Sequence, residues 1–65
     1  MAFNIGDKVE VYRRQDRYGF SLALPGWCGV ITNINYTPEW GDYAIVRNGS
    51  ICKAIKFTYL KHVKE

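Results

Sequence analysis

Residues 26–34 read GWCGVITNI, with two glycines around a tryptophan and a cysteine and then a run of β-branched residues. β-Branched residues favour strands, and glycine permits a sharp bend or a close backbone approach. The apolar residues Val30, Ile31 and Ile34 do not keep strict alternation, which indicates a bulge or bend part-way along the strand. We therefore predict a tightly bent strand over residues 28–36 in a very small barrel.

The segment before this strand divides into a strand and a long loop. Residues 7–12 alternate, with Val9 and Val11 on one side and polar side chains on the other, as in a half-buried strand. Residues 13–26 are too short and too rich in Gly and Pro for a helix. They predict a long, partly extended first loop folded over the barrel.

An Asn-Gly pair at residues 48–49 is the strongest hairpin signal in the chain. Both residue types tolerate the positive φ that a type I′ turn requires. The pair predicts strands over residues 43–47 and 50–56, with Arg47 directly opposite Ser50.

The last part of the chain predicts a short closing element. Residues 57–60 favour one short 3-10 turn, and residues 60–64 favour a strand with Leu60 and Val63 turned inward. The strand signals together predict an all-β, five-stranded fold that occupies residues 1–65.

Length and composition bound the class of protein. A chain of 65 residues is expected to form a single domain with a small core. Its 48% hydrophobic and 23% charged residues are typical of a folded rather than a disordered chain. No secretory signal pattern and no long apolar stretch is present, which predicts a cytoplasmic protein without membrane association.

The residues that could carry chemistry are few. Cys28 and Cys52 lie in apolar runs and are predicted to be reduced core residues, with a single bridge between them left open. Together with His62 they could supply three metal ligands, but they lack a C-x-x-C pairing. Phosphate-loop and nucleophile-elbow motifs are missing too. We expect a protein without enzymatic activity, metal or cofactor.

Several motifs resemble those of known small barrels. The G-D-x-V-x-V opening at residues 6–11 and the run of Gly29, Ile31 and Ile34 are similar to the KOW-type barrels of ribosomal and transcription-elongation proteins. The resemblance covers nearly the whole chain and implies an SH3-like barrel with a long first loop. Because one fold carries many functions, it does not by itself fix what the barrel binds.

Two other barrel groups look similar. The photosystem I stromal subunit and the variable chain of ferredoxin-thioredoxin reductase share the opening and closing strand patterns, and this resemblance implies a basic module that docks on proteins. The plasmid-type, trimethoprim-resistant dihydrofolate reductase is similar over residues 37–50. Its catalytic Val-Gln-Ile-Tyr run corresponds here to residues 51–54, which read ICKA, so the glutamine and tyrosine are missing.

Charge favours an anionic partner. The net charge is +3 and the isoelectric point is near 9.0. The basic residues fall into two groups, which form either solvated edges or an anion-binding face. The groups are Arg13, Arg14 and Arg17, and Lys53, Lys56, Lys61 and Lys64.

Basic side chains interleaved with aromatic ones predict a nucleic-acid-binding face on the loops. Aromatic rings stack on bases while cations attract phosphates. The candidate residues for binding nucleic acid or another partner are Tyr12, Arg13, Arg14, Arg17, Tyr18, Trp27, Trp40, Arg47 and Lys53.

A protein-docking or regulatory subunit is the alternative. Exposed Trp, Tyr and Arg are enriched in protein interfaces, and Phe20, Leu22 and Leu24 add an apolar strip beside them. This strip is either part of the core beneath the first loop or a surface covered by a partner. The partner could be another protein or a second copy of the chain.

Overall fold

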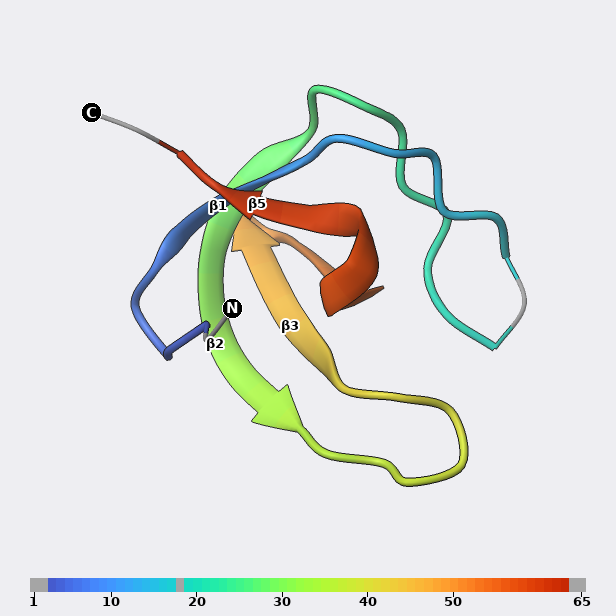
Figure 1. The fold of residues 1–65 in the computed structure, drawn as a ribbon. Coiled ribbons are helices and arrows are strands. Elements are labelled where there is room, and N and C mark those ends of the chain that lie inside the picture. The colour runs from blue at the N-terminus through green and yellow to red at the C-terminus, as the bar shows by residue number, and fades with distance from the viewer. Residues whose placement is uncertain (1–2, 18, 64–65) are drawn as a thin grey trace.

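The computed structural model describes residues 3–17 and 19–63 as an all-β protein. All strand pairs are antiparallel, and the five strands form one bent sheet in the order β4-β3-β2-β1-β5 (Figure 1). The predicted strands and the short 3-10 turn are confirmed. The elements are β1 (Lys8–Val11), β2 (Cys28–Asn35), β3 (Tyr43–Asn48), β4 (Ile51–Lys56), the 3-10 helix η1 (Phe57–Tyr59) and β5 (Leu60–His62).

The core lies on the concave face of the sheet. Val9 and Val11 of β1 are fully buried, as their alternation predicted, and Leu60 of β5 is buried beside them. Burial of a Val or Leu side chain contributes about 1.5–3 kcal/mol, so a core this small depends on every member. The buried hydrophobic residues are Phe3, Val9, Val11, Ala23, Ile31, Ala44, Val46, Ile55 and Leu60.

The predicted change of parity in β2 is a β-bulge. Ile31 lies opposite Val46, but the next pair joins Asn33 to Ile45, which leaves Thr32 as the extra residue. The Thr32 hydroxyl donates a hydrogen bond to the Ile45 carbonyl at 3.3 Å. Because the bulge reverses the alternation, Ile31 before it and Ile34 after it both contact the core.

The two glycines of GWCGVITNI have different physical roles. Gly26 has a φ of +97°, which side-chain-bearing residues rarely adopt. Gly29 instead lies against β3, where an added Cβ would be 2.5 Å from the Arg47 carbonyl oxygen. Glycine is therefore favoured at residue 26 because the chain turns before β2, and at residue 29 because β2 packs tightly against β3.

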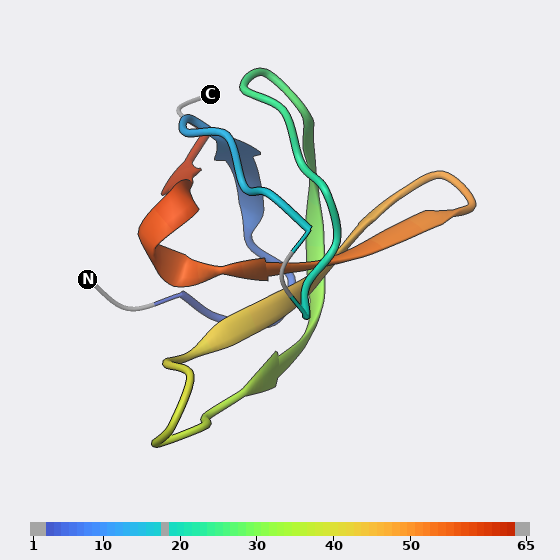
Figure 2. The same ribbon diagram turned by 90° about the vertical axis from the view of Figure 1, so that its right-hand side faces the viewer.

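The hairpin register differs from the prediction by one residue. Asn48 pairs with Ile51 and Arg47 with Cys52, so the two turn residues are Gly49 and Ser50 rather than Asn48 and Gly49. Of these two turn residues, only Gly49 has a positive φ, +62°. A positive φ at the first central position alone is the pattern of a type II′ turn, which glycine favours there. In Figure 2 this turn projects away from the rest of the sheet.

The prediction that both cysteines lie in the core is wrong. Cys28 and Cys52 are exposed, and neither is in a disulfide. Cys52 pairs with Arg47, which in turn pairs with Val30, and all three are exposed on the convex face of the sheet. The apolar runs around the cysteines reflect strand formation, but the core covers only the other face.

A contact between Asp7 and His62 fastens the turn before β1 to the closing strand. The Asp7 carboxylate accepts a hydrogen bond from the Asn4 amide at 2.9 Å and lies 3.0 Å from His62 Nε2. The Asn4 amide first, and the His62 ring second, hold the pKa of Asp7 below its ordinary value of 3.8. His62 itself is half-buried on the edge strand β5.

The contacts of Asp7 predict that the free energy of unfolding depends on pH in the acid range. A lowered pKa in the folded state stabilises the fold above the unfolded-state pKa, and that contribution disappears as the pH falls through the folded-state pKa. Asp7→Asn should therefore destabilise the protein at neutral pH and make its stability fall less steeply below about pH 4. Urea unfolding between pH 7 and pH 2.5 measures this, and parallel curves for both proteins would contradict it.

Candidate functional site

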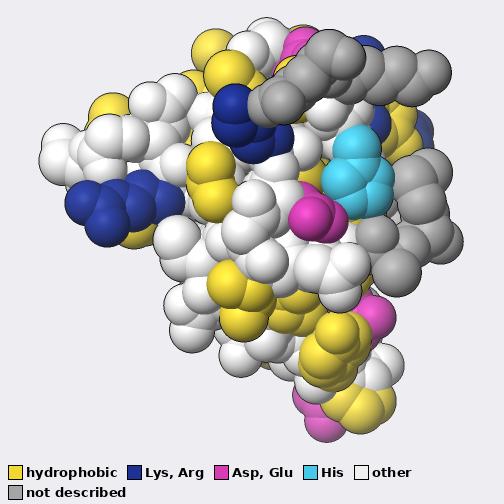
Figure 3. Space-filling view, turned by 90° about the vertical axis from the view of Figure 1, so that its left-hand side faces the viewer, with side chains coloured by type: hydrophobic (Ala, Val, Ile, Leu, Met, Phe, Trp, Pro, Cys, Tyr) yellow, Lys and Arg dark blue, Asp and Glu magenta, His cyan; other side chains and the backbone are white. Residues whose placement is uncertain are grey.

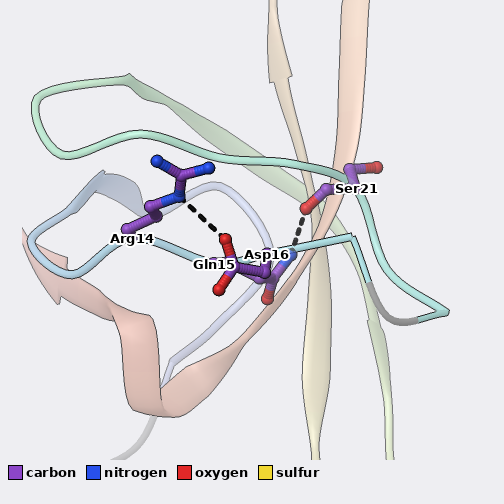
Figure 4. Close-up of polar contacts among 4 residues, drawn as sticks. All are labelled: Arg14, Gln15, Asp16 and Ser21. Carbon is purple, nitrogen blue, oxygen red and sulfur yellow. Dashed lines mark hydrogen bonds and ion pairs between the residues drawn. The ribbon is translucent and has the colours of Figure 1, made fainter.

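A buried glutamine fastens the first loop to the edge of the sheet. Gln15 is 2% exposed, and its backbone pairs with Ala23 across the loop. Its side-chain Nε2 donates to the carbonyls of Ser21 and, at 2.9 Å, Ala54. Its Oε1 accepts a hydrogen bond from the Lys56 amide at 2.9 Å. Figure 4 shows the contact between the two arms of the loop, Gln15 and Ser21.

Ser21 completes this attachment. The Ala54 amide donates to the Ser21 hydroxyl at 3.1 Å, and the Ser21 amide donates to the Ala54 carbonyl at 3.3 Å. β4 is an edge strand, and β4 and β5 are not paired with each other in the described residues. The loop thus supplies hydrogen-bond partners that a neighbouring strand would otherwise provide.

Attachment of the loop brings members of the two predicted basic groups to the edge of β4. Of the others, Lys61 lies on β5, and Lys64 is outside the described residues. Arg13 and Arg17 flank Gln15 and are exposed, while Lys53 and Lys56 flank the Ala54 carbonyl that Gln15 contacts. Arg14 is exposed as well. It forms an ion pair with Asp16 at 2.8 Å, which offsets its charge locally.

Trp27 and Lys53 also meet, as partners in a structural contact. The Lys53 ammonium lies 5.6 Å from the centre of the Trp27 ring and donates to the Leu22 carbonyl at 2.7 Å. Trp27 is half-buried and packs against the core. Both groups therefore hold the base of the first loop.

The tip of the first loop meets the loop between β2 and β3 in an aromatic cluster. The Phe20 ring lies 5.1 Å from the Tyr43 ring and 6.5 Å from the Trp40 ring, both edge-on. The Lys56 ammonium lies 5.7 Å from the centre of the Phe20 ring. Trp40 remains 61% exposed.

Two adjoining hollows share Phe20 and Lys56. The larger, of about 410 Å³, is bounded by Trp40 and Glu39, and the smaller, of about 190 Å³, lies beside Gln15. We call these two hollows the Lys56 groove. Its lining residues are Gln15, Asp16, Gly19, Phe20, Glu39, Trp40, Lys56 and Tyr59.

Two predicted site residues lie elsewhere, and Tyr18 is outside the described residues. The Tyr12 hydroxyl donates to the carbonyl of Thr58, within η1, at 2.8 Å. Arg47 lies on the convex face and donates to the Gly49 carbonyl at 2.7 Å. On that face a separate hollow of about 390 Å³ is lined by Lys8, Arg47, Asn48, two glycines and apolar side chains. Figure 3 shows this side of the protein, where basic groups are separated by hydrophobic and acidic ones.

The apolar strip of the first loop divides between the two predicted alternatives. Phe20 and Leu22 are half-buried, whereas Leu24 is exposed. The smaller buried residue Ala23 provides the inward contact of this segment. The buried position of this segment is therefore Ala23, which pairs with Gln15, and not Leu22 or Leu24 on either side of it.

Comparisons with known proteins add no assignment. The chain matches no protein-family model, and no curated protein or solved structure shows significant similarity to it. Within residues 3–17 and 19–63, no helix is long and apolar enough to cross a membrane. Over the same ranges, no group of three or more His, Cys, Asp or Glu side chains is arranged to hold a metal ion.

Proposed function

We propose that this protein is a non-enzymatic nucleic-acid-binding module. The observation that carries the proposal is the attachment of the Arg13–Arg17 segment to β4 by Gln15, which places exposed arginines along the strand edge that carries Lys53 and Lys56. Phe20 and Trp40 add aromatic surface at Lys56. Cations beside exposed rings suit a ligand that carries both phosphates and bases.

The fold proposed for this module is an SH3-like barrel of the KOW type. Three features support it: the meander β2-β3-β4, the return of β5 to pair with β1, and the 3-10 turn before β5. The long first loop of residues 13–26 is a fourth. In this arrangement the loop is hydrogen-bonded to β4, one of the two edge strands.

Salt dependence tests the proposal. About three phosphate contacts on a single strand give a slope of about −2 for log K against log salt concentration, so affinity should fall roughly 15-fold between 50 and 200 mM salt. Arg13→Gln combined with Arg17→Gln should weaken binding and make the slope shallower. Arg47→Gln on the convex face is the matched control and should change neither. Lack of binding to any nucleic acid at low salt would refute the proposal.

Docking on a protein is the second candidate. Tyr36 is 70% exposed, and together with Pro38 and Trp40 it lines an open hollow of about 360 Å³. Large exposed rings around a hollow are typical of interface hot spots. A stoichiometric protein complex that resists salt, survives the double arginine substitution and is lost in Tyr36→Ala would favour this function instead.

A further inference from the structure

We infer that the Lys56 groove binds single-stranded rather than double-stranded nucleic acid, with a base against Trp40 and its phosphate near Lys56. This inference rests on the proposed function and specifies its ligand. It starts from the accessibility of Trp40, which is 61% exposed although its ring lies 6.5 Å from that of Phe20 in a T-shaped arrangement. A T-shaped contact occupies at most one face of a ring and leaves the other for stacking.

A duplex cannot use this platform without losing a base pair. Its bases already stack on one another, whereas an unpaired base can turn its face to a side chain at no such cost. The larger hollow beside Trp40, of about 410 Å³, is open to solvent and has room for a base. The geometry therefore selects a flexible single strand.

The charges in the groove distinguish where a phosphate and where a base would lie. Lys56 lies centrally, with its ammonium 5.7 Å from the centre of the Phe20 ring, and attracts a phosphate. Glu39 lines the same hollow as Trp40 and would repel a phosphate there. A carboxylate instead accepts a hydrogen bond from the exocyclic amino group of a base.

This polarity predicts a preference among bases. Cytosine presents an amino group where thymine presents a carbonyl. A base stacked on Trp40 with its edge toward Glu39 is therefore better satisfied when it is cytosine. We expect oligo(dC) of about ten nucleotides, within the site size of one small barrel, to bind about threefold more tightly than oligo(dT) of equal length.

The experiment measures fluorescence anisotropy of labelled oligo(dC), oligo(dT) and a duplex at low salt. The single strands should bind more tightly than the duplex, and Trp40→Ala should weaken oligo(dC) binding about tenfold, the usual effect of removing one stacked ring. Glu39→Gln should bring the affinities for oligo(dC) and oligo(dT) together, because an amide both donates and accepts. Ile51→Ala, an exposed apolar position on the hairpin, is the matched control.

A second readout reports directly on the ring. Trp27→Phe leaves Trp40 as the single tryptophan, since the chain contains only these two. Its fluorescence should be quenched as oligo(dC) is added. Circular dichroism of each variant verifies that it remains folded.

These outcomes distinguish failure of the single-strand groove from failure of the proposed nucleic-acid-binding function. Salt-dependent binding that favours the duplex, or that Trp40→Ala leaves unchanged, would overturn the single-strand groove while the nucleic-acid function stood. Absence of binding to all three ligands would overturn both. A protein complex that needs Trp40, without any oligonucleotide binding, would also overturn both.

Discussion

Replacing Gln15 with leucine should lower the free energy of unfolding by about 3 kcal/mol. Leucine keeps most of the side-chain volume but removes the hydrogen bonds to the Ser21 carbonyl, the Ala54 carbonyl and the Lys56 amide. A polar group left unpaired away from water costs about 1–3 kcal/mol, and the Ala54 carbonyl alone keeps another partner, the Ser21 amide. Loss of these bonds also frees the first loop from β4.

Thermal unfolding followed by circular dichroism measures this effect. For a domain of this length, a loss of about 3 kcal/mol lowers the melting temperature by about 15 °C. Arg14→Leu is the matched control, because it introduces the same side chain at the adjacent, exposed position. Its effect should stay within about 0.5 kcal/mol. Equal melting temperatures for the two variants would show that Gln15 does not anchor the loop.

Gly29→Ala should have an effect of similar size for a steric reason. The new Cβ would lie 2.5 Å from the Arg47 carbonyl oxygen and 2.9 Å from Val46 Cγ1. The obstacle is mainly the backbone of β3, which cannot rotate away as a flexible side chain could. Because β2 and β3 are inner strands of the sheet, their separation disturbs the core on both sides, and we expect a loss of about 3 kcal/mol, the upper end for overpacking.

Urea unfolding of Gly29→Ala checks this expectation. Val30→Ala is the control, since Val30 is adjacent and lies on the exposed convex face. The control should change stability by about 0.5 kcal/mol or less. If Gly29→Ala were equally mild, the close approach of β2 to β3 could not be a constraint on the fold.

Local patterns predicted most of the fold. The alternation around Val9 and Val11 located β1 and its buried side, and the broken alternation after Val30 located the bulge in β2. These signals are visible because each concerns neighbours in the chain. The predicted hairpin register was wrong by one residue for a local reason too, since Asn48-Gly49 and Gly49-Ser50 are each favourable sequences for a two-residue turn.

The candidate site was less predictable. A glutamine in a polar loop is ordinarily exposed, and Gln15 is buried only because its partners Ala54 and Lys56 are far away in sequence. Without that contact, nothing in the sequence indicated that the Arg13–Arg17 segment lies along β4 or that Phe20 and Lys56 belong to one groove. Arg47 was among the predicted binding residues because charge alone does not reveal on which face of a strand a residue lies.

Backbone amide NMR shifts, mapped as a short oligo(dC) is added at low salt, test whether a single strand binds in the Lys56 groove. We expect the largest changes at Gly19, Phe20, Trp40 and Lys56, with smaller ones at Arg13 and Arg17. We expect no change at Val30, Arg47 and Cys52. Largest changes at those three convex-face residues, or no changes anywhere, would contradict binding in this groove.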